Sequence, residues 1–386
     1  MTLQGCGFFF TLKLIKMAAG DFTASASLRI QEKLFEAFQD PTPATSEFST
    51  PVKTAEVMLS KNTARVNEVL VNGRCEGYKI MWLKSGVDSI DYSGDGSALS
   101  LNCDVADGQE LESDDKTYDD NLRIVSTVRV DDDLCANDYA FTELSAQALQ
   151  KAMNDIRKSL CVNLVNFTDA NAQANLDSAV TDVDLGNGAW AVNADTITIE
   201  VPKGDFRNPD TLAEIDAIVQ NNNIYGNYFL LNGRTNFYNS KFNSDYKGLN
   251  DNERSIPATY GDFEMYHDVR YLDQTLGGAN TFAINPNAYV IWNRTYSQLE
   301  AVMVDTAKQI WEFYVEDPML MIMENGVMRP VRYEVAYQKV CTGRDTNTRH
   351  TNKHNWEVKY LGGRATAPQG VAGDTGVVKF KAVSAI

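Results

Sequence analysis

The sequence predicts a mixed α+β protein, and three observations support this fold class. A long amphipathic helix is indicated over residues 142–167. Asn72-Gly73 and Asn325-Gly326 each separate two apolar runs, as in tight β-hairpins. Strand and helix patterns alternate over residues 196–243, which is typical of a layered α/β unit. Hydrophobic residues make up 44% of the 386 residues and aromatic residues 10%, so the chain is rich enough in apolar groups to form a core.

The N-terminal region, residues 17–60, reads as an arm. Leu28, Leu34, Phe35 and Phe38 fall on one helical face, and Asp40-Pro41-Thr42-Pro43 ends the helix before an extended stretch to Pro51. Ahead of it, Lys13 and Lys16 interrupt an apolar patch, so an ordinary tail is expected rather than a secretion signal.

Residues 62–135 read as β structure. Strands are expected at 66–71 and 74–83, an acidic loop at 93–120 and a returning strand at 122–130. The result would be a long two-stranded excursion with little core of its own. Such a piece is marginally stable alone and needs other protein to cover it.

The next region carries the clearest helix. Its apolar positions recur every three or four residues: Leu144, Ala148, Leu149, Ala152, Met153, Ile156, Leu160, Leu164 and Phe167. At about 1.5 Å per residue, this helix would be on the order of 40 Å long, long enough to act as a spine.

The α/β region begins with a strand at 196–201. Asn208-Pro209 then starts a helix over 209–220, because Asn accepts from free backbone amides and Pro needs no donor there. A strand at 227–231 and a short helix at 234–243 are expected to follow.

The last third is mostly β. An apolar strand is predicted at 280–295, a hairpin over 319–337, and strands at 356–360 and 376–383. Residues 299–314 fit a helix, although their β-branched content also permits a strand.

Charge is unevenly distributed along a chain whose net charge is −17. Residues 88–138 hold fifteen acidic and three basic residues, a net of −12, whereas residues 327–386 hold ten basic and four acidic, a net of +6. Two interpretations stay open: both runs are solvated faces, or the acidic region of one copy docks on the basic region of another.

No pattern for chemistry stands out. His350 and His354 have the spacing of a helical zinc pair but lack its glutamate and lie in a polar, loop-like stretch, and His267 reads as a structural histidine. The acidic clusters at 114–115, 119–120 and 131–133 lack calcium-loop spacing. Phosphate-binding loops, nucleophile elbows and C-x-x-C pairs are absent from the sequence. We therefore predict no catalytic, cofactor-binding or metal residues, no cofactor and no enzymatic activity.

The order of elements resembles the major capsid protein of tailed bacteriophages, with its Hong Kong 97-type shell fold. The resemblance implies an N-terminal arm at 1–61, an extended acidic β-hairpin loop at 62–135, and a peripheral domain with the spine helix at 136–205. An axial α/β domain at 206–318 and return strands of the peripheral domain at 319–386 would complete it.

The resemblance also implies a role. The chain would assemble with itself into pentamers and hexamers of an icosahedral virion capsid, in the host cytoplasm. Portal, scaffold or decoration proteins would be partners, packaged double-stranded DNA would be touched only nonspecifically, and no membrane would be involved. The alternatives are a carboxylate-based hydrolase and another virion or surface module such as a tail protein.

Overall fold

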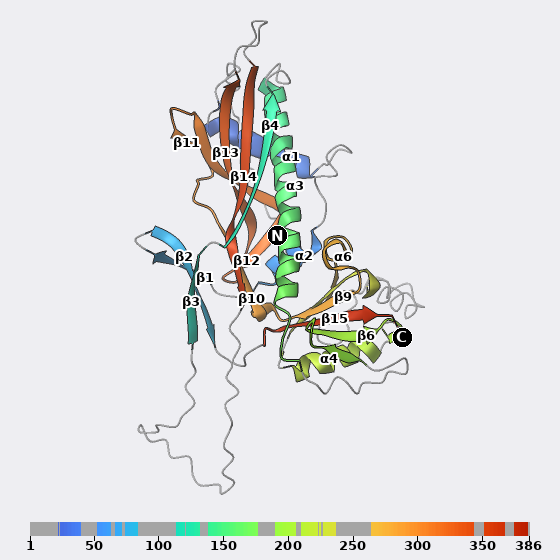
Figure 1. Cartoon of the computed structure of the whole chain (residues 1–386). Helices are drawn as coiled ribbons and strands as arrows, with labels where there is room; N and C mark the ends of the chain where they lie inside the picture. Colours follow the sequence, from blue (N-terminus) through green and yellow to red (C-terminus); the bar gives the residue numbers. More distant parts are fainter. Residues whose placement is uncertain are drawn as a thin grey trace, which may run out of the picture.

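The computed structural model describes residues 22, 24–39, 52–62, 66–71, 74–83, 113–119, 121–131, 138–176, 190–205, 210–222, 224, 227–236, 264–342, 351–366 and 374–384. They form a slender body built along one long helix, with a smaller α/β layer at its lower end (Figure 1). The predicted α+β class is confirmed.

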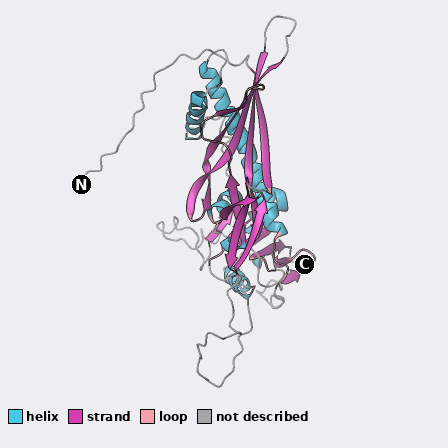
Figure 2. Cartoon of the chain, turned by 90° about the vertical axis from the view of Figure 1, so that its left-hand side faces the viewer, coloured by secondary structure: helices cyan, strands magenta, loops and turns pink. Residues whose placement is uncertain are grey.

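The long helix is α3, Asp138–Ala170, which extends the predicted helix at both ends. Thirty-three residues at about 1.5 Å each give a rod of roughly 50 Å. Its apolar stripe is fully buried from Leu149 through Ile156 to Leu164. The stripe packs against a sheet whose strands run alongside the helix (Figures 1 and 2).

This six-stranded sheet is antiparallel. Five strands follow the order β10-β14-β13-β12-β11, and a sixth, β4, also pairs with β14. The bounds are β4 Leu122–Asp131, β10 Tyr289–Arg294, β11 Val302–Asp305, β12 Ile310–Glu324, β13 Val327–Thr342 and β14 Thr351–Thr366. Tyr333, Val335 and Tyr337 of β13 are buried, whereas the residues between them are partly exposed. This alternation is expected of a sheet with one solvent-exposed face.

Two features of this sheet follow from local sequence. The predicted Asn325-Gly326 turn is confirmed: both residues have positive φ, 50° and 79°, as a type I′ turn requires. Gly363 lets β14 approach the Trp292 ring, since a Cβ there would lie 2.0 Å from Trp292 Cζ2.

Residues 299–314, left open between helix and strand, form β11 and the start of β12. The predicted strand 280–295 is two strands rather than one. Its second half is β10, and its first half is β9, Asn280–Ile284, in another sheet, with the short 3₁₀ helix η5, Pro286–Ala288, between them.

A separate three-stranded sheet projects from the body (Figure 1). It comprises β1 Val66–Val71, β2 Arg74–Leu83 and β3 Ser113–Asp119. The predicted hairpin around residues 72–73 is confirmed by the antiparallel β1–β2 pairing. The predicted returning strand is β4, but it pairs with β14 and belongs to the body, so the excursion is not a simple two-stranded loop. Residues 84–112 lie outside the described residues.

The second sheet has the order β5-β6-β15-β9-β7-β8. Its further strands are β5 Ala191–Asn193, β6 Thr198–Pro202, β7 Phe229–Asn232, β8 Glu264–His267 and β15 Val377–Val383. Helix α4, Asp210–Asn221, covers one face and has the predicted bounds to within a residue. The short helix α6, Tyr271–Leu276, lies between β8 and β9. Most of the helix expected at 234–243 lies outside the described residues.

The C-terminal strand departs from the block expected at 319–386. β15 runs parallel to β6 and antiparallel to β9, so it lies between these two strands in the second sheet and does not return to the six-stranded one. The pairing brings the end of the chain beside residues more than 90 positions earlier, which strand periodicity does not encode.

The helices of the N-terminal region pack against the long helix and the six-stranded sheet of the same chain. Helix α1, Ala24–Gln39, buries Ile30 and Leu34 against α3 and β12, while Leu28 and Phe35 are exposed, so the predicted apolar face is partly wrong. Helix α2, Lys53–Ser60, was not predicted. It buries most of its length between α3, β12 and β8.

Two cores result. The larger lies between α3, α1, α2 and the six-stranded sheet and continues onto one face of the second sheet through Phe229, Phe282 and Ile284. The smaller lies between the other face of that sheet and α4. The second sheet is thus buried on both sides.

Candidate functional site

The histidines singled out in the sequence do not meet. His354 lies in β14, so the interpretation of residues 351–355 as loop is wrong. Its ring is buried against Phe141, and Nδ1 lies 2.8 Å from the Tyr337 hydroxyl. His267 lies in β8, where burial lowers its pKa to about 4. His350 lies outside the described residues.

The acidic clusters fall on or beside strands. Asp114, Asp115 and Asp119 are in β3 and Asp131 ends β4, while residues 120, 132 and 133 lie outside the described residues. Within the described ranges, no three His, Cys, Asp or Glu side chains are grouped to hold a metal ion. Within those ranges also, none of the helices is long and apolar enough to cross a lipid bilayer.

The most deeply buried ion pair of the described residues joins the long helix to the sheet. Arg157 of α3 and Asp317 of β12 are 1% and 0% exposed, with Nε and Nη2 of the arginine 2.6 and 2.5 Å from the two carboxylate oxygens. The Tyr333 hydroxyl donates to the same carboxylate at 2.7 Å, and the guanidinium lies 4.7 Å from the centre of the Phe38 ring. We call Arg157, Asp317 and Tyr333 the spine junction.

A break in strand pairing makes room for this junction. The β12–β13 register shifts between Glu316 and Met321, and in that interval Asp317 accepts from the backbone amides of Met319 and Leu320. Burial is the largest single effect on the pKa of Arg157 and lowers it, but the charge and hydrogen bonds of Asp317 outweigh burial and leave that pKa raised. Burial and the same carboxylate raise the pKa of Tyr333. Arg157 therefore stays charged and Tyr333 stays neutral near neutral pH.

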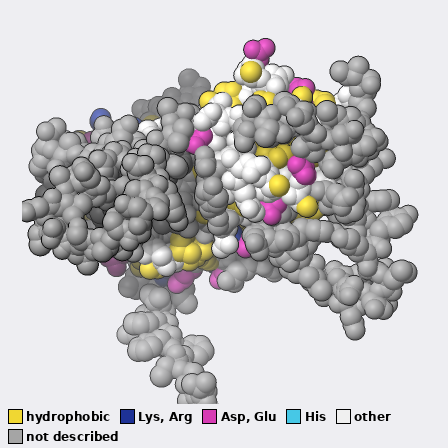
Figure 3. Space-filling view, turned by 90° about the horizontal axis from the view of Figure 1, so that it is seen from below, with side chains coloured by type: hydrophobic (Ala, Val, Ile, Leu, Met, Phe, Trp, Pro, Cys, Tyr) yellow, Lys and Arg dark blue, Asp and Glu magenta, His cyan; other side chains and the backbone are white. Residues whose placement is uncertain are grey.

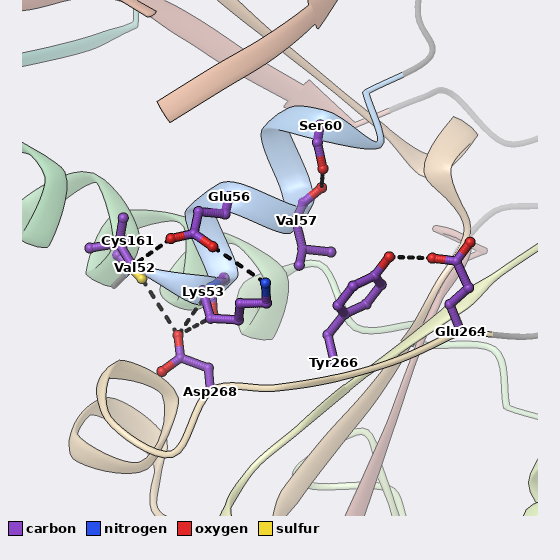
Figure 4. A network of polar contacts seen from close by, with 10 residues as sticks. Val52, Lys53, Glu56, Val57, Ser60, Cys161, Glu264, Tyr266 and Asp268 are labelled. Carbon is purple, nitrogen blue, oxygen red and sulfur yellow. Dashed lines mark hydrogen bonds and ion pairs between the residues drawn. The ribbon is translucent and has the colours of Figure 1, made fainter. Parts of the chain in front are cut away.

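A second junction joins the N-terminal region to the second sheet (Figure 4). Asp268, just after β8, accepts from the backbone amide of Thr54 at 3.1 Å and from its hydroxyl at 2.6 Å. Its other oxygen accepts from the amide of Tyr271 at 2.8 Å. One carboxylate therefore sits at the N-terminal ends of both α2 and α6, where unpaired amides and the helix dipole favour a negative charge. We call Asp268 and Thr54 the arm junction.

The cysteine at the arm junction is not set up for chemistry. Cys161 of α3 is buried, and its Sγ lies 3.6 Å from Asp268. Burial and the neighbouring carboxylate both raise its pKa, so the thiol stays protonated, and a thiol is a poor nucleophile. Nearby, Glu264 accepts from Lys61 and from the Tyr266 hydroxyl on the surface.

An aromatic pocket holds the chain ahead of α1. Phe22 is 7% exposed, with its ring centre 4.3 Å from that of Tyr337 and 5.8 Å from that of Trp356. The rings of Trp311 and Phe313 also contact the Phe22 ring. Further along, Gln31 Nε2 donates to the Leu299 carbonyl at 3.2 Å. The N-terminal region is thus attached to the sheet at several points.

Many basic side chains of the C-terminal third are engaged within the chain. Arg332 pairs with Glu316 at 3.1 Å, Lys379 with Asp169 at 2.6 Å, and Lys359 with Glu357 at 2.5 Å. Arg364 donates to the Asn163 carbonyl and lies over Phe167. Seen from below, the described surface carries scattered acidic side chains with little basic charge among them (Figure 3). These pairings weaken the idea of a broad basic docking face for the acidic region.

Sequence reasoning missed both junctions. Arg157 sits in a helix whose other buried residues are mostly apolar, so amphipathic patterning assigns it to the surface. The one available signal was Asp317-Pro318 inside an otherwise apolar strand. The charged and polar groups of the two junctions are engaged in hydrogen bonds within the chain. The junctions therefore fix the N-terminal region, the long helix and the two sheets relative to one another.

No family model and no curated protein matches the chain. Solved structures resemble it over most of its length. A capsid structure of cyanophage P-SCSP1u has 12% identity and a TM-score of 0.43, covering 87% of this chain and 90% of that one. The capsid of cyanophage Pam1 has 9% identity and a TM-score of 0.43, covering 80% and 85%. A structure of Mycobacterium phage Adephagia has 11% identity and a TM-score of 0.42, covering 90% and 97%.

Proposed function

We propose that this chain is a major capsid protein, a structural subunit that assembles with copies of itself into an icosahedral phage head. The observation that carries the proposal is the projecting sheet β1-β2-β3, which hydrogen-bonds only within itself among the described strands (Figure 1). Small sheets of this kind gain stability by packing against other protein. A neighbouring copy would supply that cover.

The body suits this role. Its strongest buried polar groups tie elements together, and the spine and arm junctions leave no solvent-exposed acid, base or nucleophile within them. Asp317, the carboxylate of the spine junction, is 0% exposed and bound to arginine, so it is out of reach of a substrate.

Within this proposal, α3 and the six-stranded sheet form the peripheral domain, and the second sheet with α4 forms the axial domain. Pentamers and hexamers would be the closed rings that build the shell. Portal, scaffold or decoration proteins, nonspecific contact with packaged double-stranded DNA, virion location and assembly in the host cytoplasm belong to the same proposal. A net charge of −17 would keep the inner wall from gripping DNA.

The test is a deletion of residues 86–120, which include β3. We expect the full chain to form rings or closed shells visible by negative-stain electron microscopy. The shortened chain should stay soluble, retain the circular dichroism and cooperative unfolding of the body, and form neither. Normal shells from the shortened chain would contradict the proposal.

A further inference from the structure

Nine of the thirteen exposed large hydrophobic side chains of the described residues lie in two places. One, which we call the edge patch, consists of Leu28, Leu299, Val302, Met303 and Val304, each 37–54% exposed. The other, the methionine patch, consists of Met319, Met321, Val327 and Met328, each 37–52% exposed. Grouped apolar exposure of this kind marks an interaction surface more often than single exposed residues do.

The edge patch lies on a sheet border. β11 is the last strand of the six-stranded sheet and pairs with β12 on one side only. Its three consecutive residues Val302, Met303 and Val304 are all exposed, so both faces of the strand are open. Leu28 belongs to the same surface, because neighbouring Ser27 and Gln31 of α1 bond to the backbone of Ala301 and Leu299. An apolar border strand invites pairing with another chain.

The methionine patch lies at the other end of β12. Met321 and Met323 alternate along the strand and so share one face, and Met328 lies directly opposite Met323 on β13. Met319 lies in the irregular stretch just before them, with its sulfur 3.7 Å from Arg157 Nη1. Methionine side chains are flexible and polarisable, and they adapt to irregular partner surfaces. The patch lies around the Asn325-Gly326 turn, at the end of the β12–β13 hairpin.

One copy cannot join its own two patches. On β12 the edge patch reaches Tyr314, whose amide bonds to Gln298 beside Leu299, so about five residues separate it from Met319, on the order of 16 Å along an extended strand of one fixed sheet. Their charged borders also differ. Two exposed acids, Glu32 and Glu300, and one exposed lysine, Lys308, lie beside the edge patch, whereas the more exposed member of the Arg329–Glu324 pair beside the methionine patch is the arginine, at 51% against 17%.

We propose that the edge patch of one copy binds the methionine patch of a second copy. The contact is heterologous, because two different surfaces of the same chain meet, and such contacts close into rings when the rotation between copies is suitable. The partner is a second copy because the separation of the patches and the different charge of their borders make them complementary to each other and not to themselves. The inference rests on the proposed shell function and specifies one contact within it.

The test is site-specific photo-crosslinking in the assembled full-length protein. A photoreactive amino acid replaces Val304, and a second sample carries it at Val269, an exposed valine outside both patches. We expect crosslinks from position 304 to residues 319–328 of another copy and none of that kind from position 269. Crosslinks from 304 to α1 or β11 of another copy, or to any other region, would overturn the inference, as would no intermolecular crosslink.

Charge reversal provides an independent readout. We expect Glu300→Arg and Arg329→Glu each to raise the protein concentration needed for assembly by about tenfold, and the double variant to restore it, because each reversed charge then meets the other. Failure of rescue would count against the pairing of these patches. If the full chain assembles but crosslinks map elsewhere, only this inference fails; if it never assembles, the proposed function fails with it.

Discussion

At the scale of single residues, the buried ion pair between Arg157 and Asp317 is the most sensitive point of the body. Both groups are withdrawn from water and are compensated by each other, by Tyr333, by backbone amides and by the Phe38 ring. A buried pair of this kind adds little net stability compared with apolar residues of the same shape, yet breaking it leaves an uncompensated charge. Its value lies in fixing the position of α3 on the sheet.

We therefore expect Asp317→Ala to lower the free energy of unfolding by about 3–5 kcal/mol, because it leaves the Arg157 guanidinium in the core without its counter-ion. The matched control is Glu316→Ala, one residue away, which removes a partly exposed pair with Arg332 and should cost less than about 1 kcal/mol. Urea unfolding followed by tryptophan fluorescence measures both. Equal losses in the two variants would show that the buried pair has no special role.

His267 makes stability depend on pH. Its folded-state pKa, about 4, lies below the unfolded value of 6.5, so below pH 6.5 the unfolded chain binds more protons. Stability is full above pH 6.5 and falls as the pH drops toward 4. The loss attributable to this residue should be about 2 kcal/mol once residual solvent screening is allowed for.

The measurement compares the wild type with His267→Gln at pH 7 and at pH 4.5. Groups common to both proteins cancel, and the variant should lose less stability on acidification. A proton NMR titration of the chain's three histidines gives the pKa directly. A value near 6.5 for His267 would refute the explanation.

At the scale of elements, the patterns that local sequence encodes were predictable. α3 and α4 follow from 3.6-residue periodicity, the β12–β13 hairpin follows from the positive φ of Asn325-Gly326, and the β1–β2 pairing follows from the Asn-Gly sequence between two apolar runs. α2 was missed because it is only eight residues long, too short for the 3.6-residue pattern to repeat clearly. Leu28 and Phe35 were placed on the wrong face because exposed apolar residues look the same, in sequence, as core residues.

The arm junction makes a specific prediction for α2. Val52, at its N-cap, provides no side-chain cap, so Asp268 supplies the acceptor from another element. Asp268→Ala should speed amide hydrogen exchange over residues 52–60 by at least about tenfold, in line with the 1–2 kcal/mol typical of a lost cap. Ser60→Ala, at the other end of α2, removes only a bond to the Val57 carbonyl and should leave exchange nearly unchanged. Similar protection in the Asp268 variant and the wild type would exclude the capping role.

At the scale of the whole molecule, the sequence predicted the order of elements but not which strands share a sheet. β4 pairs within the body and β15 pairs within the second sheet because long-range packing decides which strands pair. The alternation of residues along one strand carries no information about its partner. The N-terminal region reads as an arm in the sequence, yet Phe22, α1 and α2 are covered by their own chain. Among the described residues, the projecting sheet and the two exposed patches remain for a neighbour to cover.

The size distribution of the purified full-length chain, measured by mass photometry over a range of protein concentrations, tests the central claim most directly. The account predicts discrete species at five and six times the 42.9 kDa subunit mass, together with far larger closed particles. A single 42.9 kDa species at every concentration, from protein shown to be folded, would contradict it.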